Sequence, residues 1–441
     1  MRYEEFFYFA YANIESIAFI SLVIFAFLFL SLRRFSLSGF LDPFHIIYTF
    51  TYSTSYAVVL ALWSGGFVDG IYMLLVMLYG VLFWFVIFSL SRLNVSVGRI
   101  SLYVERAIDV RSTGAGKVVA FIYVFLTAIV LFSKGFSLFT VTNRFEDNRG
   151  LGPLVKFWSY SSLFIVAYLS IKLHLIKKRY RKRALGLVIV CLVILDSAIG
   201  GAKSDLIFYG LACVFSVSIF SGRIQVKAKS FILIFIVGII SIFTVLYFNM
   251  RSSIGSGGFE SVLSFLSVKF MDRILSNGDM YYMGLPNDVI DKVTLNNVLV
   301  VFFSPVLSLS VVSKLAGQDL SVFELGRQVL LYHYPDYNIA GGPTDHFDLF
   351  AYKYFGFLAP LFIAFLAFYI YVVRTVVSSS YNNHYMSSFY TVIWFSVMDV
   401  ILKPGTLISS IFFPFLFFAL INALCFCFKR VSMRSEYAQV Q

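Results

Sequence analysis

The sequence predicts an all-α polytopic membrane protein, and three observations predict this class. First, 59% of the 441 residues are hydrophobic and only 13% are charged, whereas soluble domains have roughly 45–50% apolar and about 25% charged residues. Second, the 52 Phe and 28 Tyr residues suit hydrocarbon and its interfaces with water. Third, apolar runs of about 20 residues, the length of a helix that crosses a bilayer, recur along the chain. A soluble protein is therefore excluded.

About eleven stretches of the sequence are apolar and long enough to cross a bilayer. They are residues 14–32, 44–62, 71–90, 118–138, 154–176, 184–199, 206–220, 231–249, 347–373, 387–402 and 407–428. These stretches take up most of the chain, so a single membrane domain is a simpler interpretation than several soluble domains.

The Lys and Arg residues explain both the formal net charge of +12 and the expected topology. They concentrate in short stretches between the apolar runs, at 33–34, 92–117, 177–183, 223–229 and 429–434, as the positive-inside rule expects of cytoplasmic loops. With these stretches inside, the N-terminus is outside and the C-terminus inside, and the inside segments hold about 20 of the 35 Lys and Arg but about 4 of the 23 Asp and Glu. Topology and anionic membrane lipids account for the basic charge, and no nucleic-acid partner is expected.

One apolar segment, 297–314, is too short for a simple span. It has about 16 apolar residues and Pro305 near its middle, so we expect an interfacial or re-entrant element. A large external stretch, 250–346, then lies between a membrane domain of eight spans (1–249) and the last three spans with a cytoplasmic tail (347–441).

Two helices are predicted in the external stretch. Apolar residues at helical spacing predict an amphipathic helix over 259–276, with Arg273 inside its apolar stripe. A second helix is predicted to start at the capping box Ser321-x-x-Glu324, where each side chain can bond the other residue's backbone N–H, and to carry Arg327.

The loop after this second helix is rich in Gly and Pro and brings His346 to the start of the next span, between Asp345 and Asp348. A neutral imidazole at the bilayer surface can take a proton from a sugar hydroxyl, so His346 is a candidate general base. The alternative is a hydrogen-bonded loop histidine.

Several cations are expected at membrane level on the external side, and they suit phosphate. They are Arg144, Arg149, Lys203, Arg251, Arg273 and Arg327. Arginine offers a planar fork of donors for phosphate oxygens, and Lys203 lies in a turn beside glycines with exposed N–H groups. The alternative is that each side chain reaches lipid headgroups or pairs with a nearby carboxylate. Arg273 is the strongest candidate, because a cation in an apolar stripe needs a buried partner or an anionic ligand.

Motifs for other chemistries are missing from the sequence. It contains no GxxxxGK[ST], HExxH, CxxC or GxSxG pattern, which argues against direct ATP-driven transport, zinc proteolysis, dithiol chemistry and a serine hydrolase. A reaction here is expected to use no metal ion and no cofactor, and to act on a substrate already in the membrane.

Four stretches in this order resemble the O-antigen polymerase (Wzy-type) family, which is related to the O-antigen ligases and to other polyprenyl-diphosphate-dependent membrane glycosyltransferases. They are FSLFTVTNRFEDNRGLG, GGAKSD, the run from YFNMRSSIG to FMDRILSN, and the run from FFSPVLSLS to GGPTDHFDLFAYKYFGFLAP. The resemblance covers most of the chain as an order of elements, with little residue identity.

The resemblance implies a metal-independent enzyme of the bacterial inner membrane whose active site faces the periplasm. It would transfer a growing glycan from undecaprenyl diphosphate to the non-reducing end of a lipid-linked repeat unit. In that family external cations matter for activity, and Arg251, Arg273 and Lys203 stand at such positions. His346 matches a functional histidine of the related ligases, although Phe347 replaces the Asn that follows it there.

Partners implied by the resemblance are the undecaprenyl-diphosphate-linked oligosaccharide, membrane lipids and a chain-length regulator protein. Three alternatives stay open from sequence: an O-antigen ligase, a lipid-linked oligosaccharide flippase or other secondary transporter, and a membrane subunit without catalytic activity. A transporter would be expected to line a midplane cavity with charged residues.

Overall fold

The computed structural model of the protein describes most of the chain. The described residues are 3–93, 115–136, 152–201, 205–222, 272, 275–294, 297–307, 314, 324–337, 341–379 and 383–439. Within these ranges the regular structure is entirely helical, with no strand. The all-α class predicted from the sequence is therefore confirmed for the part of the chain that is described.

Nine helical segments of the described residues are long and apolar enough to cross a membrane. They comprise α2 (Ile14–Ser31), α3 (Pro43–Ser64), α4 (Gly70–Leu93), α6 (Ala115–Lys134), α8 (Gly152–Leu175), α9 (Arg179–Gly200), α18 with α19 (Phe347–Phe355 and Ala359–Val377), α20 (His384–Leu402) and α21 (Leu407–Gln439). The chain is thus a polytopic membrane protein. Another predicted span corresponds to α10 (Asp205–Ser221), which is shorter, and the predicted span 231–249 lies outside the described residues.

Shorter helices complete the architecture. They are α1 (Tyr3–Ala12), α13 (Asp279–Gly284), α14 (Val289–Lys292), α15 (Val298–Leu307), α17 (Leu325–His333) and short 3-10 turns that include η4 (Ser276–Gly278) and η8 (Pro404–Thr406). α15 is the described part of the segment 297–314, and its ten residues extend only about 15 Å, half of the hydrocarbon thickness.

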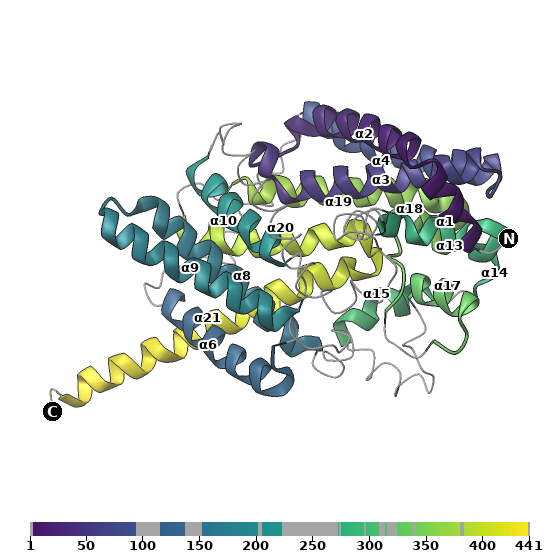
Figure 1. Ribbon diagram of the computed structural model, residues 1–441. Helices are drawn as coiled ribbons and strands as arrows, with labels where there is room; N and C mark the ends of the chain where they lie inside the picture. Colours follow the sequence, from purple (N-terminus) through teal and green to yellow (C-terminus); the bar gives the residue numbers. More distant parts are fainter. Residues whose placement is uncertain are drawn as a thin grey trace, which may run out of the picture.

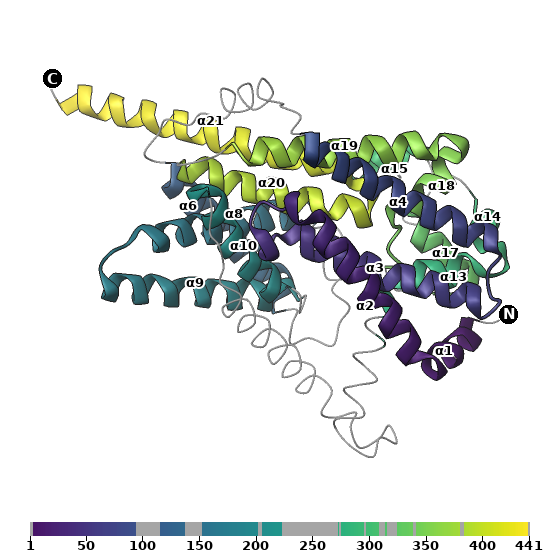
Figure 2. The ribbon, with the colours of Figure 1, turned by 90° about the horizontal axis from the view of Figure 1, so that it is seen from above.

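The helices form one elongated bundle with two distinct ends (Figures 1 and 2). α1, α13, α14 and α17 gather at the end that holds the N-terminus, which we call the N-terminal end. The turn between α8 and α9 lies at the opposite end, toward which the C-terminal part of α21 also projects. The basic turn and the C-terminus therefore lie on one side, as the predicted topology requires, while the orientation in a membrane stays a prediction.

α3 and α20 lie at the centre of the bundle. In their most apolar windows 72% of α3 and 83% of α20 is buried, against 11% of α2. Peripheral helices instead expose large apolar side chains, such as Phe19 of α2, Leu74 of α4 and Phe121 of α6. Such surfaces suit lipid, because hydrocarbon solvates an apolar side chain as well as a protein core does.

Local sequence explains how the two central helices begin. Asp42 is the N-cap of α3 and accepts a hydrogen bond from the Phe44 N–H at 3.0 Å, with Pro43 at the first helical position. Asn383 caps α20 by accepting from the Met386 N–H at 3.1 Å. Both caps pair N–H groups that have no partner inside the helix.

Two hydrogen bonds also join α3 to α20. The Tyr52 hydroxyl donates to the Ile401 carbonyl at 2.6 Å, and Trp394 Nε1 donates to Asp42 Oδ1 at 3.2 Å. The donor and acceptor on the α3 side are ten residues apart, about 15 Å along a helix, so the two central helices are connected at two levels.

Candidate functional site

The structure describes two of the sequence-predicted site residues, His346 and Arg327, and both belong to the N-terminal end of the bundle. The other candidates, namely Arg144, Arg149, Lys203, Arg251 and Arg273, lie outside the described residues. Asp272 is described and accepts a hydrogen bond from Tyr11 of α1.

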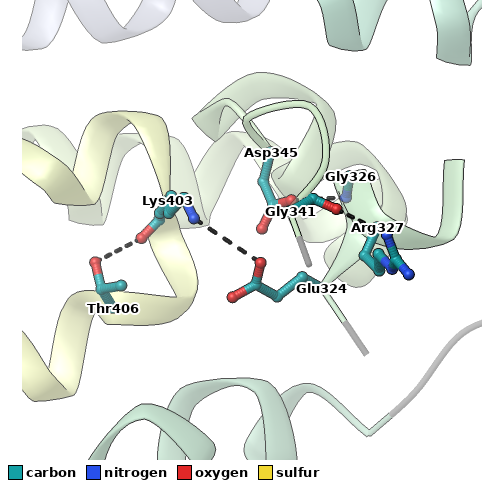
Figure 3. Close-up of polar contacts among 7 residues, drawn as sticks. All are labelled: Glu324, Gly326, Arg327, Gly341, Asp345, Lys403 and Thr406. Atoms are coloured by element: carbon teal, nitrogen blue, oxygen red, sulfur yellow. Dashed lines mark hydrogen bonds and ion pairs between the residues drawn. The ribbon is translucent and has the colours of Figure 1, made fainter. Parts of the chain in front are cut away.

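The start of α17 differs from the sequence prediction. The helix begins at Leu325 with Glu324 as its N-cap, and no side chain of the cap residue bonds the first turn, so the predicted start at Ser321 is wrong. Asp345 does the capping instead, because its Oδ1 accepts from the Gly326 N–H at 2.8 Å (Figure 3). The capping group lies 19 residues further along the chain, so a local sequence motif could not predict it.

The loop 341–346 packs closely on the first turn of α17. A Cβ on Gly326 would lie 1.9 Å from the Pro343 carbonyl oxygen, and a Cβ on Gly342 would lie 3.0 Å from the Arg327 nitrogen. Only glycine allows the two backbones to approach this closely. The loop is therefore fixed against α17 before it reaches His346.

Arg327 holds the other part of the same loop. Its Nη1 donates to the Gly341 carbonyl at 3.1 Å and its Nη2 to the Tyr337 carbonyl at 2.6 Å, and the guanidinium lies 5.5 Å from the centre of the Tyr337 ring. Figure 3 shows the contact with Gly341. A diphosphate bound by this residue would share or replace these carbonyl contacts.

Asp345 also lies near two charged side chains. Lys403 Nζ is 3.8 Å from Glu324 Oε2, and both side chains are about half exposed, so this ion pair contributes only about 0–1 kcal/mol. Burial raises the pKa of Asp345 to about 7, and the charge of Glu324 adds to this effect. The Gly326 N–H and Lys403 act in the opposite direction but do not offset the burial. The carboxyl group therefore titrates near neutrality.

His346 is fully buried, in contrast to the sequence prediction of a histidine at the bilayer surface. Its ring lies between those of Tyr52 and Tyr281, with centroid distances of 5.4 and 5.0 Å. The backbone N–H of His346 donates to the Leu402 carbonyl at 3.0 Å. The reason is that Tyr52 of α3 and Tyr281 of α13, which are distant in sequence, cover the ring of His346. His346 itself has a φ of 52° and immediately precedes α18.

The chemistry of His346 is that of a neutral base. Burial lowers the pKa of His346 to about 4, and a contact with the Asn277 carbonyl counteracts this only in part. Its Nε2 lies 3.3 Å from Thr344 Oγ1, while Nδ1 has no hydrogen-bond partner. Thr344 is half-buried, so the group nearest to this ring nitrogen belongs to a residue that is in part exposed.

Asp348 lies two residues further on and is also fully buried. The Tyr281 hydroxyl donates to its carboxylate, at 2.9 Å from Oδ1 and 2.8 Å from Oδ2, and the Leu349 N–H lies 2.8 Å from Oδ1. α13 and α18, which are distant in sequence, are thus joined through this carboxylate.

Sequence reasoning missed three tyrosines of α3 that complete this group. Tyr48, Tyr52 and Tyr56 are spaced four residues apart, on one face of the helix, and their neighbouring rings are 5.0 and 5.4 Å apart. The available signal was the hydroxyl-rich run TFTYSTSY inside an otherwise apolar span. Such a run is expected to face protein rather than lipid, because polar groups in hydrocarbon need partners.

Neither a metal centre nor a known relative identifies the site. Within the described ranges, no three His, Cys, Asp or Glu side chains come together closely enough to hold a metal ion. Comparisons of the chain with protein-family models, with curated proteins and with solved structures give no match.

Proposed function

We propose that the protein is a polysaccharide (O-antigen) polymerase of the bacterial inner membrane. It would transfer a growing glycan from undecaprenyl diphosphate to the non-reducing end of a lipid-linked repeat unit on the periplasmic side, without a metal. The observation that carries the proposal is the neutral His346, linked through Thr344 to a loop at one end of the bundle. The order of sequence elements that resembles the Wzy-type family supports it further.

The proposed reaction forms one bond and breaks another at the anomeric carbon. The acceptor hydroxyl oxygen bonds to this carbon, and the bond from the carbon to the diphosphate oxygen breaks, so that lipid diphosphate leaves with the electron pair. The proton of the acceptor hydroxyl passes to the Thr344 oxygen while the Thr344 hydroxyl gives its own proton to His346 Nε2. The Thr344 oxygen and His346 Nε2 are 3.3 Å apart. This relay lets a buried base act on a substrate that remains at the surface.

Cations stabilise the leaving diphosphate in this proposal. Arg251 and Arg273 are its principal ligands, and Lys203, Arg144, Arg149 and Arg327 are the additional candidates. Preorganised donors around a developing anion are commonly the largest contribution to such a reaction.

A second candidate function, a lipid-linked oligosaccharide transporter, is favoured by one observation. Asp196 of α9 is buried among the spans, where it accepts hydrogen bonds from Tyr123 at 2.8 Å and from Ser162. Carboxylates inside spans are typical of ion-coupled transporters. The third option, ligation to lipid A core by the same chemistry, differs only in the acceptor.

Reconstitution with a carrier-linked repeat unit as the only substrate tests the proposal. We expect the wild type to produce a ladder of longer glycans. His346→Ala and Thr344→Val should slow laddering by about 10²-fold or more, since a general base contributes about 10²–10⁴-fold, whereas Thr344→Ser keeps the hydroxyl and should remain active. Arg251→Ala and Arg273→Ala should also lose the ladder, and Arg181→Ala, at the opposite end of the bundle, serves as the matched control.

The outcomes separate the candidates. If folded wild-type protein makes no ladder from its matching repeat unit, the polymerase proposal is wrong. Single transfer to a lipid A core acceptor would indicate a ligase, and movement of the intact lipid-linked unit across the bilayer would indicate a transporter. Full activity of His346→Ala would remove this residue from the mechanism.

A further inference from the structure

Asp348 is a buried carboxylate for which the described chain provides no cationic partner. Its side chain has no exposed surface, and its hydrogen bonds come from the neutral Tyr281 hydroxyl and the backbone of Leu349. An isolated negative charge in such a place is costly, so it is neutralised by a proton or by a bound cation.

Two tyrosine hydroxyls of α3 lie near this carboxylate. The hydroxyls of Tyr48 and Tyr56 are buried and have no hydrogen-bond partner of standard geometry. Asp348 interacts electrostatically with both of these tyrosines, and Tyr56 extends toward it without completing a hydrogen bond of standard geometry. Buried polar groups in native proteins nearly always have partners, so these two hydroxyls near an uncompensated charge indicate a missing ligand.

Among the described residues, the titratable groups near Asp348 do not supply a positive charge. His346 is neutral because burial lowers its pKa to about 4. In the preceding loop, Asp345 and Glu324 are acids, and Lys403 is half exposed and pairs with Glu324. The groups that face Asp348 from α3 and α13 are tyrosines.

We propose that Asp348, together with the phenol oxygens of Tyr56 and Tyr281, forms a buried site for one monovalent cation, either Na⁺ or a proton. Oxygen atoms of a carboxylate and of phenols are suitable ligands for a hard cation. A water molecule could satisfy the orphaned hydroxyls but would leave the charge uncompensated. The site lies beside His346, yet the inference depends on the carboxylate and its neighbours and holds whether or not the protein is a polymerase.

Thermal unfolding of the purified protein in detergent tests this site, with NaCl compared against choline chloride at equal ionic strength. If Na⁺ is the ligand, it raises the Tm of the wild type at about pH 8 in a saturable way, because a ligand that binds only the folded state stabilises it. If the ligand is a proton, Na⁺ has no specific effect, and acidification stabilises the wild type more than Asp348→Asn. In both cases Asp348→Asn abolishes the response that depends on the site.

Two further variants keep the test decisive. Tyr56→Phe retains the ring that packs on Gly80 but removes a ligand oxygen. If Na⁺ is the ligand, about tenfold more Na⁺ should be needed for half of the rise in Tm, equivalent to about 1.4 kcal/mol. If the ligand is a proton, the stabilisation by acid should be smaller than in the wild type. Asp196→Asn changes another buried carboxylate whose oxygens are already paired and should leave the response intact. The proposal is overturned if the wild type responds to neither Na⁺ nor acid, or if Asp348→Asn and Tyr56→Phe respond as the wild type does.

Discussion

Asp345 is expected to make stability depend on pH. Its pKa is about 7 in the folded protein, against about 4 in an unfolded chain. Between these values the folded state binds more protons, so the free energy of unfolding should fall as pH rises from about 4 to about 7. One pKa unit corresponds to about 1.4 kcal/mol, which limits the effect to a few kcal/mol. Tm measured across this range in detergent gives the slope.

Asp345→Asn is the control for this prediction. The amide keeps an oxygen that can accept the hydrogen bond from Gly326, but it does not titrate. The variant should therefore fold with a shallower dependence of Tm on pH. An unchanged slope would show that Asp345 is not the responsible group.

Gly326 is predicted to tolerate no side chain. Gly326→Ala places a Cβ 1.9 Å from the Pro343 carbonyl oxygen, and two backbones would have to separate, so we expect a loss of about 1–3 kcal/mol or more in the free energy of unfolding. Gly186→Ala in α9 is the matched control, because its Cβ meets no atom within 4 Å and alanine favours a helix by about 1 kcal/mol. Equal stability of the two variants, measured by thermal unfolding, would contradict the close packing.

Single residues also mark the limit of sequence reasoning about the site. His346 and Asp348 could be nominated because they stand beside a span. The burial of His346 could not be predicted from the sequence, because the rings that cover it belong to Tyr52 and Tyr281, which are far from it in sequence. Burial in turn changes the predicted chemistry, from a surface base to one that needs a hydroxyl relay.

At the level of elements, the caps of the two central helices, α3 and α20, are expected to differ in how much they stabilise the protein. Asp42 accepts hydrogen bonds from Leu37, Phe44 and Trp394, so Asp42→Ala leaves several buried donors unpaired and should cost about 2–5 kcal/mol. Asn383 caps α20 through one bond, and Asn383→Ala should cost about 1 kcal/mol. Thermal unfolding of both variants checks the order, and a larger loss for Asn383→Ala would contradict it.

The elements themselves were largely predictable, because a span is a local property. Apart from 231–249, each predicted span overlaps a described helix or, for 347–373, the pair α18 and α19, although α21 continues to Gln439, beyond the predicted end at 428. A long apolar run has no other stable form in a bilayer. The start of α17 was not predictable, because the group that caps it, Asp345, lies in a loop that reaches back from the following span.

For the whole molecule, the two ends of the bundle predict which positions face opposite sides of the membrane. In a cysteine-free background, Asp336→Cys, exposed in the loop after α17, should react with a membrane-impermeant thiol reagent in intact spheroplasts. Lys178→Cys, in the turn before α9, should react only after lysis, because basic turns are retained inside. Labelling of Lys178→Cys in intact spheroplasts would reverse the topology, and labelling of both would show leakage.

The two bonds between α3 and α20 have a mechanical consequence. Because Tyr52 is tied to Ile401 and Asp42 to Trp394, any sliding of one helix along the other stretches both bonds together. The pair of α3 and α20 is therefore expected to move as one rigid unit that resists sliding of either helix along the other. In the proposed polymerase, a growing glycan would then be accommodated by displacement of the peripheral helices, which expose large apolar side chains, rather than by sliding of α3 along α20.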